Sequence, residues 1–141
     1  MLAMKKILIR LLRVAVIAAA VVSLRGEPAL FGHKSLAGQS LDADGVKAVL
    51  LGKKISLGDV RIVIVIVKTS ADQEQFLQQA IGMSTSQFQN YWRRRFMTGG
   101  GSAPKIVESD ADAEKLAAET VGAVAILDKA KAGNLVILAS K

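Results

Sequence analysis

The feature that most constrains the fold is an almost unbroken run of β-branched residues at positions 60–67, with the sequence VRIVIVIV. A strand with one face in water alternates apolar and polar residues, whereas a strand covered on both faces is apolar at nearly every position. The run therefore predicts a central strand in a sheet that has helices on both sides.

Helical patterns alternate with this strand and with two shorter apolar runs. The apolar spacing and the capping residues predict helices over about residues 43–51, 71–81, 84–97 and 110–120. Residues 123–127 and 135–139 are predicted to form two more short strands. Strands interleaved with helices indicate an α/β domain with a short, mostly parallel sheet.

The third expected helix is aromatic. Phe88, Tyr91, Trp92 and Phe96 lie within nine positions, at spacings that put them on one helical face. This face is predicted to belong to the core, with Trp92 largely buried. The adjacent arginines at positions 93–95 are expected to point mostly outward.

The charge is concentrated at the N-terminus. The chain carries +7 overall, and five of its cations lie before residue 27, which leaves +2 for residues 27–141. Successive helical residues are about 100° apart, so the arginines at positions 93–95 cannot converge on one groove. No nucleic-acid partner is therefore expected.

Residues 1–26 are interpreted as a signal peptide or an N-terminal anchor. Four cations precede an apolar run at residues 14–24, and Arg25, Gly26 and Pro28 follow it. This run of eleven residues is short for a bilayer span, which needs about 20. The protein is expected to be periplasmic, or membrane-anchored if the segment is not cleaved. Residues 27–40 are expected to be a linker, and residues 41–141 the domain.

The order of elements over residues 82–127 carries a family resemblance. An aromatic helix, a glycine loop, an acidic helix and a short apolar strand follow one another in GMSTSQFQNYWRRRFMTGGGSAPKIVESDADAEKLAAETVGAVAIL. Together with the upstream VKAVLLGKK and TSADQEQFLQQAIGMS, this resembles small exported proteins related to phosphate ABC transporter substrate-binding proteins, of the type 2 periplasmic binding protein class. The resemblance covers roughly residues 41–138. It implies a single periplasmic-binding-protein-like lobe.

The strand-to-helix junction after residue 67 is the main candidate site. Backbone N–H groups and the helix dipole at such a junction attract an oxyanion, and Thr69 and Ser70 add hydroxyl donors. The resemblance implies that Thr69, Ser70, Ala71 and Asp72 wrap a phosphate. The alternative is an ordinary capping box formed by Ser70 and Gln73.

A second candidate is the glycine loop formed by Gly99, Gly100, Gly101 and Ser102. It resembles the F-x-G-x-G-x-P element of the same family, and three glycines permit either an anion nest or a tight crossover. The alternative is a flexible surface connection.

The residue types argue against catalysis. The chain has no cysteine, and its one histidine, His33, falls in the expected linker. Neither a nucleophile with its base nor a metal site can be assembled from these residues. No enzyme activity, cofactor or metal is therefore expected.

The sequence is interpreted as an exported, non-catalytic binding protein that takes phosphate or a similar oxyanion weakly. A single lobe has only half of the usual two-lobed clamp, so binding is expected to be weak unless a homodimer supplies a second wall. A transporter or another envelope protein is the expected protein partner. The alternative is an interaction module that keeps the fold and has lost the ligand. Exposure of Thr69 and Ser70 beside the glycine loop would favour binding.

Overall fold

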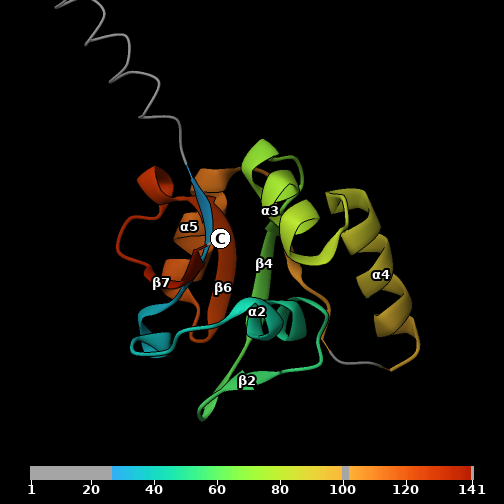
Figure 1. Ribbon diagram of the computed structural model, residues 1–141, viewed down its shortest axis with the longest axis horizontal. Helices are drawn as coiled ribbons and strands as arrows, with labels where there is room; N and C mark the ends of the chain where they lie inside the picture. Colours follow the sequence, from blue (N-terminus) through green and yellow to red (C-terminus); the bar gives the residue numbers. More distant parts are fainter. Residues whose placement is uncertain (1–26, 100–101, 141) are drawn as a thin grey trace, which may run out of the picture.

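The computed structural model describes residues 27–99 and 102–140 (Figure 1). The signal or anchor expected at residues 1–26, and Gly100 and Gly101 of the glycine loop, lie outside the described residues. The strands are β1 Pro28–Gly32, β2 Ser56–Leu57, β3 Val60–Arg61, β4 Val63–Val67, β5 Lys105–Val107, β6 Ala123–Asp128 and β7 Val136–Ser140. The helices are α2 Ala43–Leu50, α3 Ala71–Ile81, α4 Thr85–Met97 and α5 Asp110–Glu119, with short 3-10 helices η1 Lys34–Leu36 and η2 Lys129–Lys131.

The main sheet has the strand order β5-β4-β6-β1-β7. β4 pairs in parallel with β5 and with β6, whereas β1 is antiparallel to both β6 and β7. Four of the five strands in this sheet therefore run in one direction, and only β1 is reversed. The short, mostly parallel sheet expected from the sequence is confirmed.

Two apolar layers cover the sheet, which accounts for the apolar run in β4. Ile64 and Ile66 face the layer formed by α2, α3 and α4, whereas Val65 and Val67 face α5. All four of these side chains are buried because each face of β4 has its own helical cover. The predicted central strand with helices on both sides is confirmed for residues 63–67. Residues 60 and 61 do not belong to it, because they form β3, which pairs with β2 in a separate two-stranded sheet. In Figure 1, α4 lies at the opposite side of the domain from β7.

The linker expected over residues 27–40 is wrong in its first part, because β1 forms there. This strand lies between β6 and β7, and Ala29 and Leu30 are completely buried. Its five residues, PALFG, are too few to show a clear period. Pro28 is accommodated because it is the first residue of the strand. The three-residue strand β5 was likewise not expected from the sequence.

The aromatic helix α4 is only partly a core element. Trp92 is 6% exposed and Phe88 is fully buried, as predicted, but Phe96 is 58% exposed. α4 is fastened to the end of α2, since the indole Nε1 of Trp92 donates to the carbonyl of Leu50 at 3.0 Å. The last turn of α4 extends beyond that contact, which leaves Phe96 uncovered.

Arg95 differs from the outward orientation expected for all three arginines. Its guanidinium carbon lies 5.7 Å from the centre of the Trp92 ring, and its Nη2 donates to the carbonyl of Gly52 at 2.9 Å. Arg93 and Arg94 are exposed.

Within the described part of the chain, no helix has the length and apolar character that a bilayer span requires.

Candidate functional site

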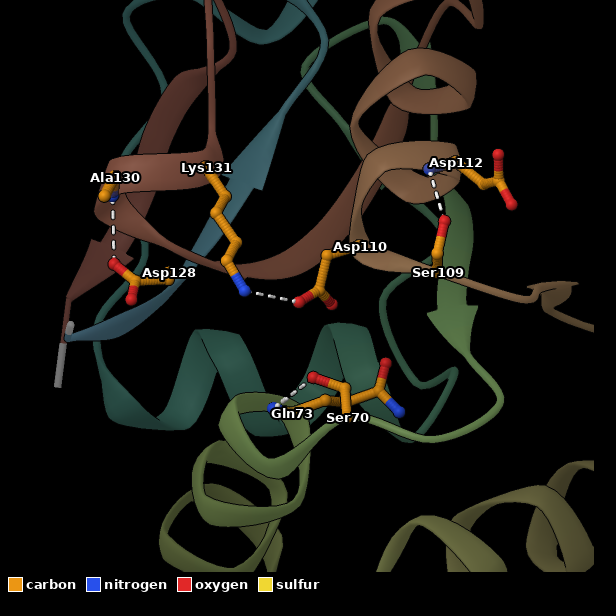
Figure 2. Close-up of polar contacts among 8 residues, drawn as sticks. All are labelled: Ser70, Gln73, Ser109, Asp110, Asp112, Asp128, Ala130 and Lys131. Carbon is orange, nitrogen blue, oxygen red and sulfur yellow. Dashed lines mark hydrogen bonds and ion pairs between the residues drawn. The ribbon is translucent and has the colours of Figure 1, made fainter. Parts of the chain in front are cut away.

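The carboxyl ends of β4, β5 and β6 lie at one edge of the sheet, and each is followed by the start of a helix. Ser70 caps α3, Ser109 caps α5 and Asp128 caps η2. Figure 2 shows these three caps near one another. Open α/β sheets bind ligands at this edge, because the helix N-termini present unpaired N–H groups there.

The capping box expected at Ser70 is only half formed. The Oγ of Ser70 accepts a hydrogen bond from the Gln73 N–H at 3.3 Å, but the Gln73 side chain turns inward. It is completely buried and pairs with the backbone of Val67. A complete capping box forms instead at the start of α4, between Ser84 and Gln87. The spacing that suggested a box at Gln73 could not reveal this internal role.

A groove of ≈ 440 Å³ lies between the N-terminal ends of α3 and α4. Thr69, Ser70 and Ala71 line it, as the sequence suggested, while Asp72 is not among its lining residues. The groove is also rich in hydroxyl groups from α4, which the sequence reading missed. Its other lining residues are Lys68, Glu74, Ser84, Thr85, Ser86 and Gln89.

Several N–H groups at this groove are available to a ligand. The first N–H groups of a helix have no intrahelical acceptor. The N–H groups of Gln73, Thr85 and Gln87 are satisfied by neighbouring side chains. Those of Ala71 and Ser86, which line the groove, have no hydrogen-bond partner among the described residues. Donors from two helices therefore surround one groove, with a partial positive charge at each helix end.

The carboxylate of Glu74 already occupies part of the α4 N-terminus. Its Oε2 accepts the N–H of Thr85 at 2.8 Å. The hydroxyl of Thr85, followed by the Thr85 N–H, lowers the pKa of Glu74, so the side chain is ionised at neutral pH. The Thr69–Ala71 end of the groove lies beside Lys68, whose Nζ is 3.9 Å from the Oε1 of Glu108.

On the other flank of α3, Lys131 neutralises a group of carboxylates. Its Nζ lies 3.1 Å from the Oδ2 of Asp110 (Figure 2). This contact with Asp110, with smaller contributions from Asp72 and Asp128, raises the pKa of Lys131. The Oδ1 of Asp110 is buried and has no partner among the described residues.

Across all of the described residues, no three side chains of the metal-binding types form a group able to hold a metal ion.

The two sequence candidates lie at opposite edges of the sheet. Ser102 lines a separate hollow, together with Val63 and Lys105 at the amino ends of β4 and β5. Ser70 follows the carboxyl end of β4. The junction is exposed or half-exposed, as binding requires, but the glycine loop does not lie beside it. Gly99 has a φ of +79°, and a Cβ added there would meet no described atom within 4 Å, which fits a surface connection.

His33 is buried rather than part of a linker, and it contacts a serine. Its Nδ1 lies 2.8 Å from the Oγ of Ser35 and accepts the Ser35 N–H at 3.0 Å. The same Oγ also accepts the N–H of Gly122 at 3.1 Å. These bonds cap η1 and join it to the start of β6, so the pair has a structural role that the sequence did not reveal.

Comparisons with known proteins identify the fold. No protein-family model and no curated protein matches the sequence. The structure is similar to an ABC-type phosphate transport receptor from Vibrio cholerae, with a TM-score of 0.59, 10% identity, and coverage of 80% of this chain and 45% of the receptor. It is equally similar, with a TM-score of 0.59 and 14% identity, to a protein from Clostridium perfringens described as a phosphate ABC transporter substrate-binding protein with bound phosphate. That match covers 80% of this chain and 44% of the other.

The chain thus spans less than half the length of each protein that it matches. The described domain has the fold of a single periplasmic-binding-protein-like lobe, which confirms the expected fold class. The similar proteins are receptors and binding proteins, and the identities are too low to transfer a ligand by likeness alone.

Proposed function

We propose that this protein is a non-catalytic binding protein that takes phosphate or a similar oxyanion at the β4–α3 junction. The observation that carries the proposal is the groove between the starts of α3 and α4, where the N–H groups of Ala71 and Ser86 have no partner among the described residues. The hydroxyls of Thr69 and Ser70 lie beside them. N–H groups at a helix N-terminus are suited to an oxyanion.

The same geometry indicates weak binding. The groove is open to solvent on one side, its lining includes the ionised carboxylate of Glu74, and no arginine lines it. A ligand held by one wall keeps part of its hydration shell, and its affinity is reduced accordingly. Dissociation constants in the millimolar range are expected for phosphate alone.

Both ends of the described domain lie at the edge of the sheet that carries the groove. Pro28 is paired with Asp128, and Ala29 with Ser140, so the described domain begins and ends at the edge of the sheet where Ser70 lies. A homodimer, a transporter or an envelope protein placed at this edge would close the groove and raise the affinity.

Export is part of the proposal and rests on the sequence of residues 1–26. Cations before an apolar run direct a chain to the secretory machinery. Cell fractionation of the tagged full-length protein in a bacterial host tests this. Recovery in the periplasm or at the envelope is expected, and recovery in the cytosol alone would remove the transport role.

The binding test is a titration of the full-length protein with phosphate, followed by amide NMR. The signals of Ser70, Ala71, Asp72 and Ser86 should shift together, while those of β7 stay in place. Ser70→Ala removes a hydroxyl donor and a helix cap, whereas Ser70→Gly preserves most of the capping at a cost of only a few tenths of a kcal/mol. Loss of binding in both variants, with Ser70→Gly still stable, would assign the hydroxyl to the ligand.

A variant that gains affinity provides a sharper test, because misfolding cannot produce it. Glu74→Gln removes the negative charge from the groove and should strengthen phosphate binding about threefold, the effect of one partly solvated charge. Glu119→Gln is the matched control, because Glu119 is the last residue of α5 and does not line the groove. This variant should leave the affinity unchanged. Equal affinities for wild type and Glu74→Gln, or no amide shifts at millimolar phosphate, would reject the groove as the site.

The alternative, an interaction module without a ligand, is favoured by one observation. Phe96 and Met97 are 58% and 78% exposed on the last turn of α4, a large apolar surface for adjacent residues. Sedimentation of the wild type and of Phe96→Ser distinguishes the two functions. The interaction module would be supported if the wild type self-associates, if Phe96→Ser abolishes this association, and if phosphate has no effect on the protein.

A further inference from the structure

A hollow of ≈ 490 Å³ opens at the amino ends of β4 and β5, at the opposite edge of the sheet from the β4–α3 junction. Its walls come from the segment after α2, from β3 and β4, from α4 and from the start of β5. Its volume falls within the range of small-molecule sites in proteins. The proposed oxyanion groove uses none of these residues.

The interior of the hollow is apolar. Val49, Ile62, Ile64 and the indole of Trp92 line it, and these residues belong to or pack against the main core. Ile55 also lines it and is 61% exposed, which is a high value for an isoleucine next to a concave surface. A ligand with an apolar body would cover Ile55 and remove its surface from water.

The rim of the hollow is cationic. Lys54, Arg61 and Lys105 line it, and the lining includes no carboxylate. Within the described residues, none of these three cations forms an ion pair with a carboxylate. Residues 27–141 carry a net charge of only +2, so three unpaired cations at one hollow are a local concentration of charge. A concave, apolar surface with such a rim focuses a positive potential on its ligand.

We propose that this hollow binds an amphipathic organic anion, namely a medium-chain carboxylate with its alkyl chain against Trp92 and Ile55. Its carboxylate lies at the cationic rim, where the planar guanidinium of Arg61 matches the geometry of a carboxylate. Inorganic phosphate gains only the contacts of the rim here, because it has no apolar part to place against Trp92 and Ile55. The carboxylate and the oxyanion therefore occupy separate sites.

Trp92 makes the site directly measurable, because it is the only tryptophan in the chain and it lines the hollow. The experiment is a titration of the full-length protein with decanoate below its micelle concentration, followed by tryptophan fluorescence. Acetate and decanol are titrated in parallel as the head group and the alkyl chain alone. Decanoate should change the Trp92 emission with saturation, and each half-ligand should bind at least about tenfold more weakly.

Two matched pairs of variants locate the ligand. Lys54→Gln should weaken decanoate binding about fivefold, while Lys53→Gln, one position away and outside the hollow, should not. Ile55→Ser should weaken it about tenfold, while Ile137→Ser, on the exposed side of β7, should not. All four side chains are exposed, so the variants should fold, and circular dichroism checks this.

The proposal is overturned if decanoate leaves the Trp92 emission unchanged, if decanol binds as tightly as decanoate, or if the members of each pair behave alike. A phosphate titration in the same samples keeps the two sites separate. Phosphate should leave Trp92 emission unchanged, whatever its effect on the amides of Ser70 and Ala71.

Discussion

The side chain of Gln73 forms two hydrogen bonds with the backbone of Val67: the Val67 N–H donates to Oε1, and Nε2 donates to the Val67 carbonyl, each at 2.8 Å. Nε2 also approaches the Oγ1 of Thr85 at 3.3 Å. One buried amide therefore joins the end of β4, the first turn of α3 and the start of α4. These are the three elements that form the proposed oxyanion groove.

Gln73→Ala should lower the free energy of unfolding by about 2–4 kcal/mol, because the N–H and C=O of Val67 lose their partners in a buried position. Chemical denaturation measures the change. Gln75→Ala removes the same type of side chain from an exposed position on α3 and should have an effect within about 0.5 kcal/mol. Similar losses for the two variants would mean that the Val67 contact is not important for stability.

The pH dependence of stability should report on Glu74. Its pKa is lowered in the folded protein by the hydroxyl and N–H of Thr85, so the folded state binds its proton less readily than the unfolded state does. The resulting stabilisation is present above the pKa of an unfolded glutamate, about 4.3, and is lost as the pH falls through the lower folded-state value. Wild type should therefore exceed Glu74→Gln in stability at pH 7, and the difference should shrink in acid. A difference that does not change with pH would contradict this assignment.

Two aromatic side chains of α4, Trp92 and Phe96, should respond very differently to truncation. Trp92→Ala removes a side chain that is 6% exposed and donates to Leu50, so it should cost about 3–5 kcal/mol. Phe96→Ala removes one that is 58% exposed and should cost less than about 1 kcal/mol. Thermal unfolding of both variants checks the contrast. A large loss for Phe96→Ala would show that the last turn of α4 is covered in solution.

The sequence predicted the elements whose patterns are long or locally determined. These include the apolar run of β4, the α3 boundaries and the helix expected over residues 84–97, which all depend on residues close in the chain. β1 could not be recognised, because its five residues become a strand only through pairing with β6 and β7, about 100 residues away. The role of Gln73 was hidden for the same reason, since its partner depends on how α3 packs against β4.

The candidate site was predicted in part. Thr69, Ser70 and Ala71 do line one groove, because a strand followed by a cap is a local pattern. The contribution of α4 was missed, since a periodic pattern shows where a helix starts but not which other helix start it meets. Whether the glycine loop lies beside the junction was left open by the sequence, and the direction of β4 places the two at opposite edges of the sheet.

The cap formed by His33 gives a prediction for the start of the domain. His33→Ala removes the acceptor of the Ser35 N–H and of the Ser35 hydroxyl, which should destabilise the protein by about 1 kcal/mol or somewhat more. His33→Asn keeps a side-chain acceptor at a position that favours asparagine, and it should restore most of the stability. Equal destabilisation by the two substitutions would show that the packing of the imidazole, rather than the cap, is what matters.

Two glycines with positive φ should differ strongly in their tolerance of a side chain. Gly122 has a φ of +79°, and a Cβ there would overlap the carbonyl oxygen of Arg61. Gly82, the C-cap of α3, has a φ of +67° and no atom within 4 Å of such a Cβ. Gly82→Ala should therefore cost about 1 kcal/mol from backbone strain alone.

Gly122→Ala carries the same strain and must also displace the backbone where β6 begins. Its N–H donates to Ser35 and its carbonyl accepts from Val63, so a shift at this position weakens both contacts. The cost should exceed that of Gly82→Ala by at least about 2 kcal/mol. Urea denaturation of the two variants measures the difference, and hydrogen exchange at Val63 should accelerate only in Gly122→Ala. Equal stabilities would mean that the close approach of Arg61 and Gly122 is not maintained in solution.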